Sequence, residues 1–162
     1  GKMAKKLGIK RLALESERGY HIELHNPSAI PKAPMMVAAG KFVVTPMEGR
    51  IRCAGVVEFA STEAVAQDGP LKFIKRQIAA LFPDLTYDHM SEWMGRRPAT
   101  TDSLPLIGPA GAIDNGHMAF GHQHIGLTAG PKTGRLIADM VSNHPNNADL
   151  SAFDPARYQA SS

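Results

Sequence analysis

Cysteine is almost absent from the sequence. The single residue, Cys53, excludes an internal disulfide framework and is typical of a reducing compartment. Long apolar runs are also missing, since none approaches the roughly 20 residues that a membrane-spanning helix needs. The basic N-terminal residues have no long apolar core and no small-residue cleavage site, so we do not expect a signal peptide. The sequence therefore predicts a cytoplasmic protein, with any membrane association peripheral and at the inner membrane face.

Strong charge of one sign is lacking as well. The formal net charge is +3 at pH 7, and the few aromatic residues, 6% of the chain, are not interleaved with basic ones. A basic cluster within residues 2–11, where a short helix is expected at 2–7, could touch phosphate or anionic lipid. A solvated helix face explains this cluster more simply. We therefore expect no nucleic-acid partner.

The residues that are present predict a fold with strands and helices. Runs of β-branched and aromatic residues predict strands at 18–24, three short strands within 35–60, and further strands at 87–95 and 117–122. Apolar residues recur at helical spacing over 69–84, up to Pro83, and again over 126–142. The residues expected on one face of this last helix are Leu127, Leu136, Ile137, Met140 and Val141. These elements predict an α+β fold, an antiparallel or mixed sheet with flanking helices.

The segment GHQHIGLT, residues 121–128, lies where the expected strand meets the last helix. Its two histidines and His117 could form an open zinc site. No carboxylate or cysteine stands beside them at a familiar ligand spacing, so polar side chains at a strand-to-helix turn are the simpler interpretation. The glycines favour another function, because they let backbone amides approach a ligand closely. With the unpaired N–H groups and positive dipole end of the helix, they suit an anion or an electron-rich carbonyl.

Two further groups of residues could carry chemistry. Pro98 fixes the backbone after Arg97, and an arginine in such a rigid turn could clamp a carboxylate through its planar face. On this motif alone, a surface salt bridge or a cap on a neighbouring loop explains Arg97 more simply, and Arg96 beside it would face the opposite way in a strand. In the segment 15–24, Tyr20 and His21 could act with neighbouring glutamates as acid–base groups, although a strand-edge histidine is the simpler account. Alternation there puts Tyr20 and Ile22 on one face, with His21 and Glu23 on the other.

Taken in order, four segments resemble the C-terminal half of the FAD-dependent oxidoreductases of the D-amino-acid oxidase superfamily, with the bacterial D-amino-acid dehydrogenases as the closest branch. The segments are ESERGYHIEL (15–24), VVTPMEGRIRCAGVVEFA (43–60), WMGRRPATTDSLPLIGP (93–109) and FGHQHIGLTAGPKTGRLIADM (120–140). Each motif alone is weak, and their shared order carries the resemblance.

The resemblance implies a division of the chain and a set of site residues. Residues 1–95 would be part of a substrate-binding domain, and residues 96–162 would return to the FAD-binding domain. Arg97 would grip the substrate carboxylate, while Glu58, Tyr20 and His124 would line the substrate site. The FAD-binding residues would be the loop formed by Gly121, His122, Gln123, His124, Ile125, Gly126, Leu127 and Thr128. No catalytic base and no metal ligand are implied.

The implied reaction oxidises an amino acid at its α-carbon. Hydride passes to the flavin, and the resulting imino acid hydrolyses to a keto acid and ammonia. The amino acid and the electron acceptor stay open, since D-alanine and a ring-bearing D-proline derivative both suit the resemblance.

One expected motif is missing from the sequence. The superfamily begins with a Rossmann strand–turn–helix that carries G-x-G-x-x-G and a later acidic residue, and this chain has neither. We therefore expect a fragment that lacks the N-terminal Rossmann half and needs that half, or a partner chain, to hold FAD tightly and to be active. Two alternatives stay open. One is a free-standing carboxylate-binding module without redox activity, and the other is a small zinc protein that uses His117, His122 and His124.

Overall fold

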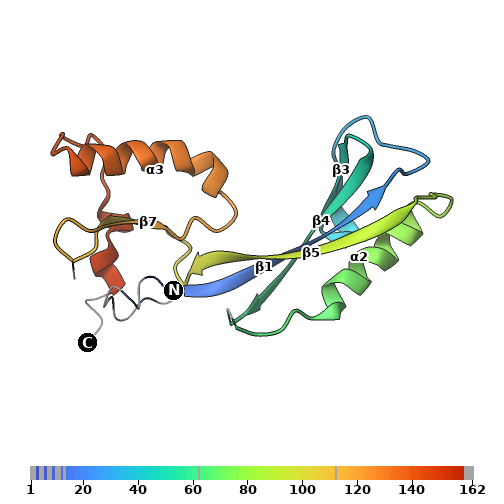
Figure 1. Ribbon diagram of the computed structural model, residues 1–162, viewed down its shortest axis with the longest axis horizontal. Helices are drawn as coiled ribbons and strands as arrows, with labels where there is room; N and C mark the ends of the chain where they lie inside the picture. The colour runs from blue at the N-terminus through green and yellow to red at the C-terminus, as the bar shows by residue number, and fades with distance from the viewer. Residues whose placement is uncertain are drawn as a thin grey trace. The chain divides into compact units, whose positions relative to one another are not determined.

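A computed structural model describes residues 3, 6, 9, 12, 14–61, 63–111 and 113–158. These residues form an α+β fold with a five-stranded sheet, a two-stranded sheet and two α-helices (Figure 1), which confirms the predicted fold class. The short helix and the basic cluster expected within residues 2–11 fall mostly outside the described residues.

The chain divides into two compact units. The sheet unit is Glu17–Arg96, and the terminal unit joins Gly1–Ser16 to Arg97–Ser162. Residues 1–16 thus fall in the same unit as the C-terminal residues, whereas the division implied by the resemblance placed them in one domain with residues up to 95. The roles of the two units in substrate and FAD binding stay predictions.

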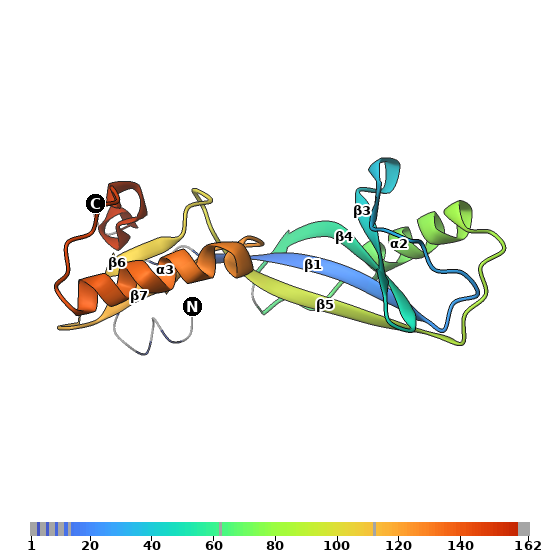
Figure 2. The same cartoon turned by 90° about the horizontal axis from the view of Figure 1, so that it is seen from above.

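The larger sheet has the strand order β2-β3-β4-β1-β5. β2 pairs with β3 and β3 pairs with β4, both antiparallel. The ring of His25 on β1 stacks on His89 of β5. Four residues earlier on β1, His21 stacks on Trp93, which lies four residues later on β5. The two strands therefore run in opposite directions between these contacts (Figure 2). The strands are β1 (Leu14–His25), β2 (Met35–Val37), β3 (Phe42–Met47), β4 (Arg50–Ala60) and β5 (His89–Thr100).

Helix α2 (Asp68–Leu81) covers one face of this sheet in the sheet unit (Figure 1). Its periodic apolar residues include Ile74 and Ile78, which are buried against the strands, as the sequence predicts. The helix ends where the Phe82 N–H bonds to the Ile78 carbonyl, at 2.9 Å, immediately before Pro83. The core that results comprises Tyr20, Ile22, Leu24, Phe42, Val44, Ile51, Cys53, Ile74 and Ile78.

The alternation predicted for β1 is confirmed. Tyr20 and Ile22 point into the core beneath α2. His21 and Glu23 lie on the opposite face, where their side chains contact each other. Strand residues alternate between faces, so one strand supplies both a buried apolar row and an accessible polar row.

Strand β4 changes its alternation at Val56. Ile51 and Cys53 point into the core, yet beyond Val56 the even-numbered Glu58 reaches the core side and contacts Tyr20. Val56 has a φ of 59°, a left-handed conformation that a β-branched residue rarely adopts. Just before it, a side chain at Gly55 would lie 2.5 Å from the Phe42 Cα atom, so only glycine allows β3 this close. One left-handed residue therefore sends Glu58 to the side opposite Arg52.

The terminal unit holds the second sheet and the last helix. β6 (Leu106–Pro109) and β7 (His117–Phe120) pair antiparallel, and α3 (Gly126–Val141) packs on both strands (Figure 1). Two short 3-10 helices follow, η2 (Ser151–Phe153) and η3 (Pro155–Tyr158), and both contact β6. A further 3-10 turn, η1 (Ala38–Gly40), lies in the other unit, between β2 and β3.

Two local predictions are wrong. Leu127 and Val141 were expected on the apolar face of the last helix, but they are 96% and 63% exposed, whereas Leu136 is buried as expected. Pro98 was expected to hold a rigid turn, but it lies within β5, which extends to Thr100. β5 is at the edge of its sheet, where the missing N–H group of a proline leaves no ladder bond broken.

Candidate functional site

The loop at residues 121–128 begins with a glycine that no other residue could replace without strain. Gly121 follows β7 with a φ of 89°. A Cβ atom built on it would lie 2.9 Å from Cγ2 of Thr100 and 3.6 Å from the Cα of Pro105. Positive φ and close packing both favour glycine, so this residue is fixed by the end of β5 and by the turn that follows it.

The loop then attaches to β5 and turns into the helix. His122 forms an isolated antiparallel bridge with Ala99 of β5. Gln123 adopts a φ of 50°, and the Ile125 N–H donates to the His122 carbonyl at 3.0 Å. This tight turn delivers the chain into α3 within a few residues.

The first amides of α3 face no side-chain cap. Ile125 is the N-cap residue and makes no capping hydrogen bond, and the first turn contains no acidic residue. The helical hydrogen bonds of α3 begin with the Ala129 N–H, which donates to the Ile125 carbonyl at 2.9 Å. The N–H groups of Gly126, Leu127 and Thr128 therefore precede the helical bonding pattern and can donate to an electron-rich group.

The histidines of this region do not form a metal site. Nε2 of His122 lies 2.9 Å from Oγ1 of Thr133 on α3, so this ring ties the loop to its own helix. Among residues 14–61, 63–111 and 113–158 and the four described before them, no group of three or more His, Cys, Asp or Glu side chains could hold a metal ion. His117, His122 and His124 thus do not assemble the ligand set that the zinc alternative requires.

The predicted carboxylate clamp, Arg97, lies on β5 and is the first residue of the second segment of the terminal unit. Its neighbour Arg96, the last residue of the sheet unit, points its Nη2 toward the Ala64 carbonyl at 3.4 Å. Adjacent strand residues project to opposite faces, so Arg97 projects away from the side on which Arg96 makes this bond.

Tyr20 and Glu58 meet in the sheet unit. The Tyr20 hydroxyl donates to Oε2 of Glu58 at 2.5 Å. Burial, together with this bond to a carboxylate, raises the pKa of Tyr20 above its ordinary value. Tyr20 is therefore held as a neutral hydrogen-bond donor to Glu58.

The same carboxylate is bound by a residue that the sequence did not reveal. Arg18 is fully buried, and its Nη1 lies 3.3 Å from Oε2 of Glu58. Nη1 also donates to the main-chain carbonyl of Val65 (2.9 Å), and Nη2 donates to those of Ser61 (2.9 Å) and Ala64 (2.5 Å), all in the segment between β4 and α2. The cluster of Arg18, Tyr20 and Glu58 thus fastens this segment to β1.

No sequence signal distinguished Arg18 from a surface arginine. Arg18 occupies an even-numbered position of β1, on the same side as Tyr20. This alternation was the one indication in the sequence that Arg18 faces the core. The partner at position 58 becomes accessible only through the left-handed Val56, which no periodicity predicts.

The opposite face of the sheet carries a second polar cluster, centred on Glu23. Arg52 contacts Oε1 of Glu23 through Nε at 2.8 Å and Nη2 at 2.7 Å, and Nε of Arg50 lies 3.2 Å from Oε2. Burial alone would raise the pKa of Glu23, but Arg52, Arg50 and His21 lower it below its ordinary value. Burial and the charge of Arg52 likewise lower the pKa of His21, which stacks on Trp93 at 4.9 Å.

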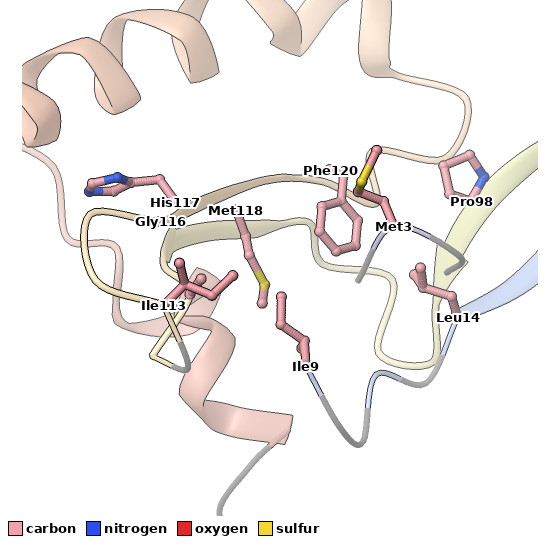
Figure 3. A pocket seen from close by; sticks show the side chains of 10 residues that line it. Met3, Ile9, Leu14, Pro98, Ile113, Gly116, His117, Met118 and Phe120 are labelled. Carbon is pink, nitrogen blue, oxygen red and sulfur yellow. The ribbon is translucent and has the colours of Figure 1, made fainter. Parts of the chain in front are cut away.

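An apolar cavity of about 370 Å³ lies in the terminal unit. Ile9 and Met118 face one another across it, and Phe120 and His117 of β7 contribute to its wall (Figure 3). The remaining lining residues are Met3, Leu14, Pro98, Ala110, Ile113 and Gly116. None of these side chains was predicted as a site residue, except that His117 belonged to the zinc alternative.

The structure thus brings some predicted residues together. Tyr20 and Glu58 are in direct contact, and the loop at 121–128 is continuous with the α3 N-terminus. Arg97 and His124 belong to the terminal unit, whereas Tyr20 and Glu58 belong to the sheet unit. The assignment of all these residues to substrate or flavin stays a prediction.

Comparison with known proteins identifies the family. The sequence pattern described as FAD dependent oxidoreductase (DAO) matches residues 1–140. The chain belongs to this family. As the resemblance implied, it is related to D-amino-acid oxidases and dehydrogenases. It is 36% identical over 151 residues to a D-amino-acid oxidase of Bradyrhizobium diazoefficiens, a match that covers 91% of this chain and 36% of the relative. It is 31% identical to a D-amino acid dehydrogenase of Xanthobacter autotrophicus, over 94% of this chain and 36% of the relative.

Solved structures of family members share the fold. The crystal structure of L-proline dehydrogenase from P. horikoshii matches with a TM-score of 0.72 at 18% identity, over 94% of this chain and 42% of that one. The chain therefore spans well under half the length of these two relatives and of this structure, 36–42%. Within the described part of the chain, no helix has the length and apolar character that crossing a membrane requires.

Proposed function

We propose that the chain is the substrate-side and C-terminal portion of an FAD-dependent amino-acid oxidoreductase that acts on D-amino acids, as a dehydrogenase. The family and the relatives named D-amino-acid oxidase and D-amino acid dehydrogenase support the class of reaction. The D series is supported by the names of the two relatives alone, because the matched structure is named for L-proline, and we propose no particular amino acid.

The observation that carries the proposal is the loop at 121–128. Gly121 is locked in a left-handed conformation, and it leads into a helix whose first amides have no side-chain cap and no acidic neighbour. These features fit the isoalloxazine ring of FAD, whose pyrimidine end carries carbonyl oxygens that accept hydrogen bonds. Gly126 also leaves open space at this point, since a Cβ on it would find only the His122 Cβ, at 3.5 Å.

The proposed roles follow from the donors that each residue offers. The amides of Gly126, Leu127 and Thr128 would donate to the flavin carbonyls, and the helix dipole would stabilise negative charge there. Arg97 would bind the substrate carboxylate through two parallel N–H groups and so orient the α-carbon. Glu58, Tyr20 and His124 stay proposed residues of the substrate site on the strength of the resemblance, and the one hydroxyl proton of Tyr20 is donated to Glu58.

The bound flavin would supply the acceptor for the hydride of the α-carbon. The chain's own contribution would be to position the amino acid and to exclude water from the reacting atoms. We assign no catalytic base to these residues, because an amine that enters neutral needs none. The imino acid product would hydrolyse in water to the keto acid and ammonia.

The division of labour between the two units is part of the proposal. The substrate domain would lie within residues 1–95, and residues 96–162 would complete the FAD-binding domain. A Rossmann half, which a longer polypeptide or a partner chain would supply, would account for the remaining length of the relatives. This chain alone would bind FAD weakly and would not turn over. A cytoplasmic location, with at most peripheral contact to the inner membrane face, accompanies the proposal.

The test uses the native species. An antibody against this chain should capture, from source cells, a polypeptide or complex that contains FAD and is larger than the chain alone. Adding a D-amino acid without oxygen should bleach the visible absorbance of the flavin, and the matching L-amino acid should not. A captured species with no flavin, or one that binds amino acids without bleaching, would overturn the proposal. The second result would favour a carboxylate-binding module.

The residue assignment has its own test in that flavoprotein. Arg97→Lys should raise KM by about tenfold or more, because lysine loses the two-pronged contact with the carboxylate. Arg96→Lys is the matched control, since its guanidinium contacts a main-chain carbonyl instead. Equal effects of the two substitutions would remove Arg97 from the proposed site.

A further inference from the structure

We propose that Arg157, paired with Asp102, is a positioning residue for the loop at 121–128, acting through the turn at 100–105. The pair connects the C-terminal 3-10 helix η3 to the turn that follows β5, at a separation of 55 positions. An effect of this contact on FAD binding rests on the proposed function, whereas its effect on the conformation of the loop does not.

The first step is the grip of Arg157 on the turn. Nε of Arg157 lies 2.7 Å from Oδ2 of Asp102, and Nη2 lies 3.3 Å from Oδ1. Nη2 also donates to the Leu104 carbonyl at 2.7 Å and to the Pro105 carbonyl at 3.3 Å. One planar guanidinium therefore fixes both the side chain and the main chain of the turn.

The second step is the stiffness of the turn itself. Thr100 Oγ1 donates to the same Leu104 carbonyl at 2.7 Å, and the Leu104 N–H donates to Oδ1 of Asp102 at 3.1 Å. Ser103 adopts a left-handed φ of 62°. Asp102 is thus bound from inside the turn by a backbone amide and from outside by Arg157. Because both sets of bonds share the Asp102 carboxylate and the Leu104 carbonyl, loss of the guanidinium loosens the whole turn.

The third step joins the turn to the loop. Gly121 packs directly on this turn, since a Cβ on it would lie 2.9 Å from Thr100 Cγ2 and 3.6 Å from the Pro105 Cα. The next residue, His122, bridges to Ala99, which immediately precedes the turn. The left-handed start of the loop therefore rests on residues whose geometry Arg157 holds.

The arginine is itself held in place by its helix. Pro155 is buried and lies against β6, where a Cβ on Gly108 would come within 2.9 Å of the proline Cδ. Nη1 of Arg157 bonds to the Asp154 carbonyl at 3.1 Å, and the neighbouring Tyr158 hydroxyl lies 3.1 Å from Thr101 Oγ1. The guanidinium therefore reaches the turn from a fixed base and loses little freedom on binding.

The test measures the loop in the chain as it exists, without flavin. Amide hydrogen exchange and amide NMR resonances should be recorded for the chain and for Arg157→Ala. Exchange within 101–105 and at Gly121 and His122 should rise by about tenfold, the factor expected when one charge-assisted hydrogen-bonded contact is lost. Exchange in α2, which belongs to the other unit, should stay unchanged. Asp102→Asn should shift the same amide resonances, and the effect of the two substitutions together should be smaller than the sum of the separate effects, because they share the Arg157–Asp102 contact.

A matched control is available on α3. Nε of Arg135 contacts both carboxylate oxygens of Asp139, at 3.0 and 3.1 Å, in an exposed pair of the same unit. Arg135→Ala should leave the resonances of Gly121 and His122 in place. Arg157→Lys should restore them only in part, since lysine can pair with Asp102 but cannot reach both carbonyls with a planar fork.

The outcomes separate this inference from the proposed function. If Arg157→Ala loosens 101–105 and 151–158 but leaves Gly121 and His122 unchanged, Arg157 only anchors the tail and the inference is wrong. Uniform loss of protection across the terminal unit, also seen for Asp102→Asn, would equally overturn it. Addition of FAD tests the other question. If the loop loosens as expected but the native protein contains no flavin, the positioning role of Arg157 stands and the proposed function is wrong.

Discussion

Nη1 of the buried Arg18 lies 3.3 Å from Oε2 of Glu58, which also accepts the Tyr20 hydroxyl. The guanidinium is fully buried, so the carboxylate offsets a charge that water does not reach. The effect on stability is therefore different for the intact pair and for the loss of one partner. The pair adds modest stability as a whole, but removal of one partner leaves the other charge unsatisfied.

Glu58→Gln should therefore destabilise the sheet unit by about 3 kcal/mol, because it leaves the Arg18 charge buried and unpaired. Urea denaturation of the chain, followed by far-ultraviolet circular dichroism, measures this. Glu92→Gln is the control, since the ion pair of Glu92 with Lys75 is exposed on both sides and should change stability by less than about 1 kcal/mol. Equal losses in the two variants would show that Arg18 is not dependent on Glu58.

Gly121→Ala should destabilise the terminal unit by about 1–3 kcal/mol, since alanine is strained at a φ of 89° and would collide with Thr100. Gly130→Ala is the matched control. It lies within α3 with nothing within 4 Å of a new Cβ, so alanine there should raise stability by up to about 1 kcal/mol. Thermal unfolding of both variants gives the comparison, and a neutral Gly121→Ala would contradict the left-handed loop.

The thiol of Cys53 should resist modification in the folded chain. Burial raises its pKa to about 12, so almost no reactive thiolate exists at pH 8. A chromogenic disulfide reagent should react only as the sheet unit opens, and its rate should rise with urea. Because the folded pKa lies above the unfolded value, the neutral thiol contributes stability below about pH 8.5, and that contribution falls as the pH rises toward 12. Fast labelling without denaturant would contradict the buried position.

Acid should weaken the cluster around Glu23. Its pKa is lowered by the arginines, so its contribution is complete above the unfolded pKa of about 4.3 and is lost as the pH falls through the lower folded value. Glu23→Gln should therefore cost less stability at pH 2 than at pH 7. Asp68→Asn, at an exposed helical pair with Lys72, should change stability by less than about 0.5 kcal/mol at either pH. Denaturant midpoints at the two pH values decide this, and a pH-independent loss would count against it.

Local periodicity accounts for much of what the sequence predicts. The alternation of β1, the apolar stripe of α2 and the glycine-marked start of α3 depend on neighbours within one or two turns of chain, so they could be inferred directly. The family resemblance, which the comparisons confirm, required the order of four such segments.

The residues that were missed depend on distant partners. Arg18 finds Glu58 at 40 positions, and Arg157 finds Asp102 at 55, and no composition or spacing reports such contacts. Leu127 was placed on the apolar face because periodicity extends to the first turn of a helix, whereas that turn projects beyond the strands that α3 covers. Pro98 was assigned to a turn because proline usually interrupts sheets, and the edge position of β5 removes that restriction.

The left-handed Val56 gives β4 a change of phase in the middle of one strand. Upstream of it, even-numbered residues such as Arg52 serve the cluster around Glu23, and downstream of it, the even-numbered Glu58 serves Arg18 and Tyr20. If this single residue took an ordinary extended conformation instead, the downstream half of β4 would exchange its two faces. Glu58 would then lie on the same side of the sheet as Arg52, and the buried Arg18 would lose its counter-charge through one backbone dihedral.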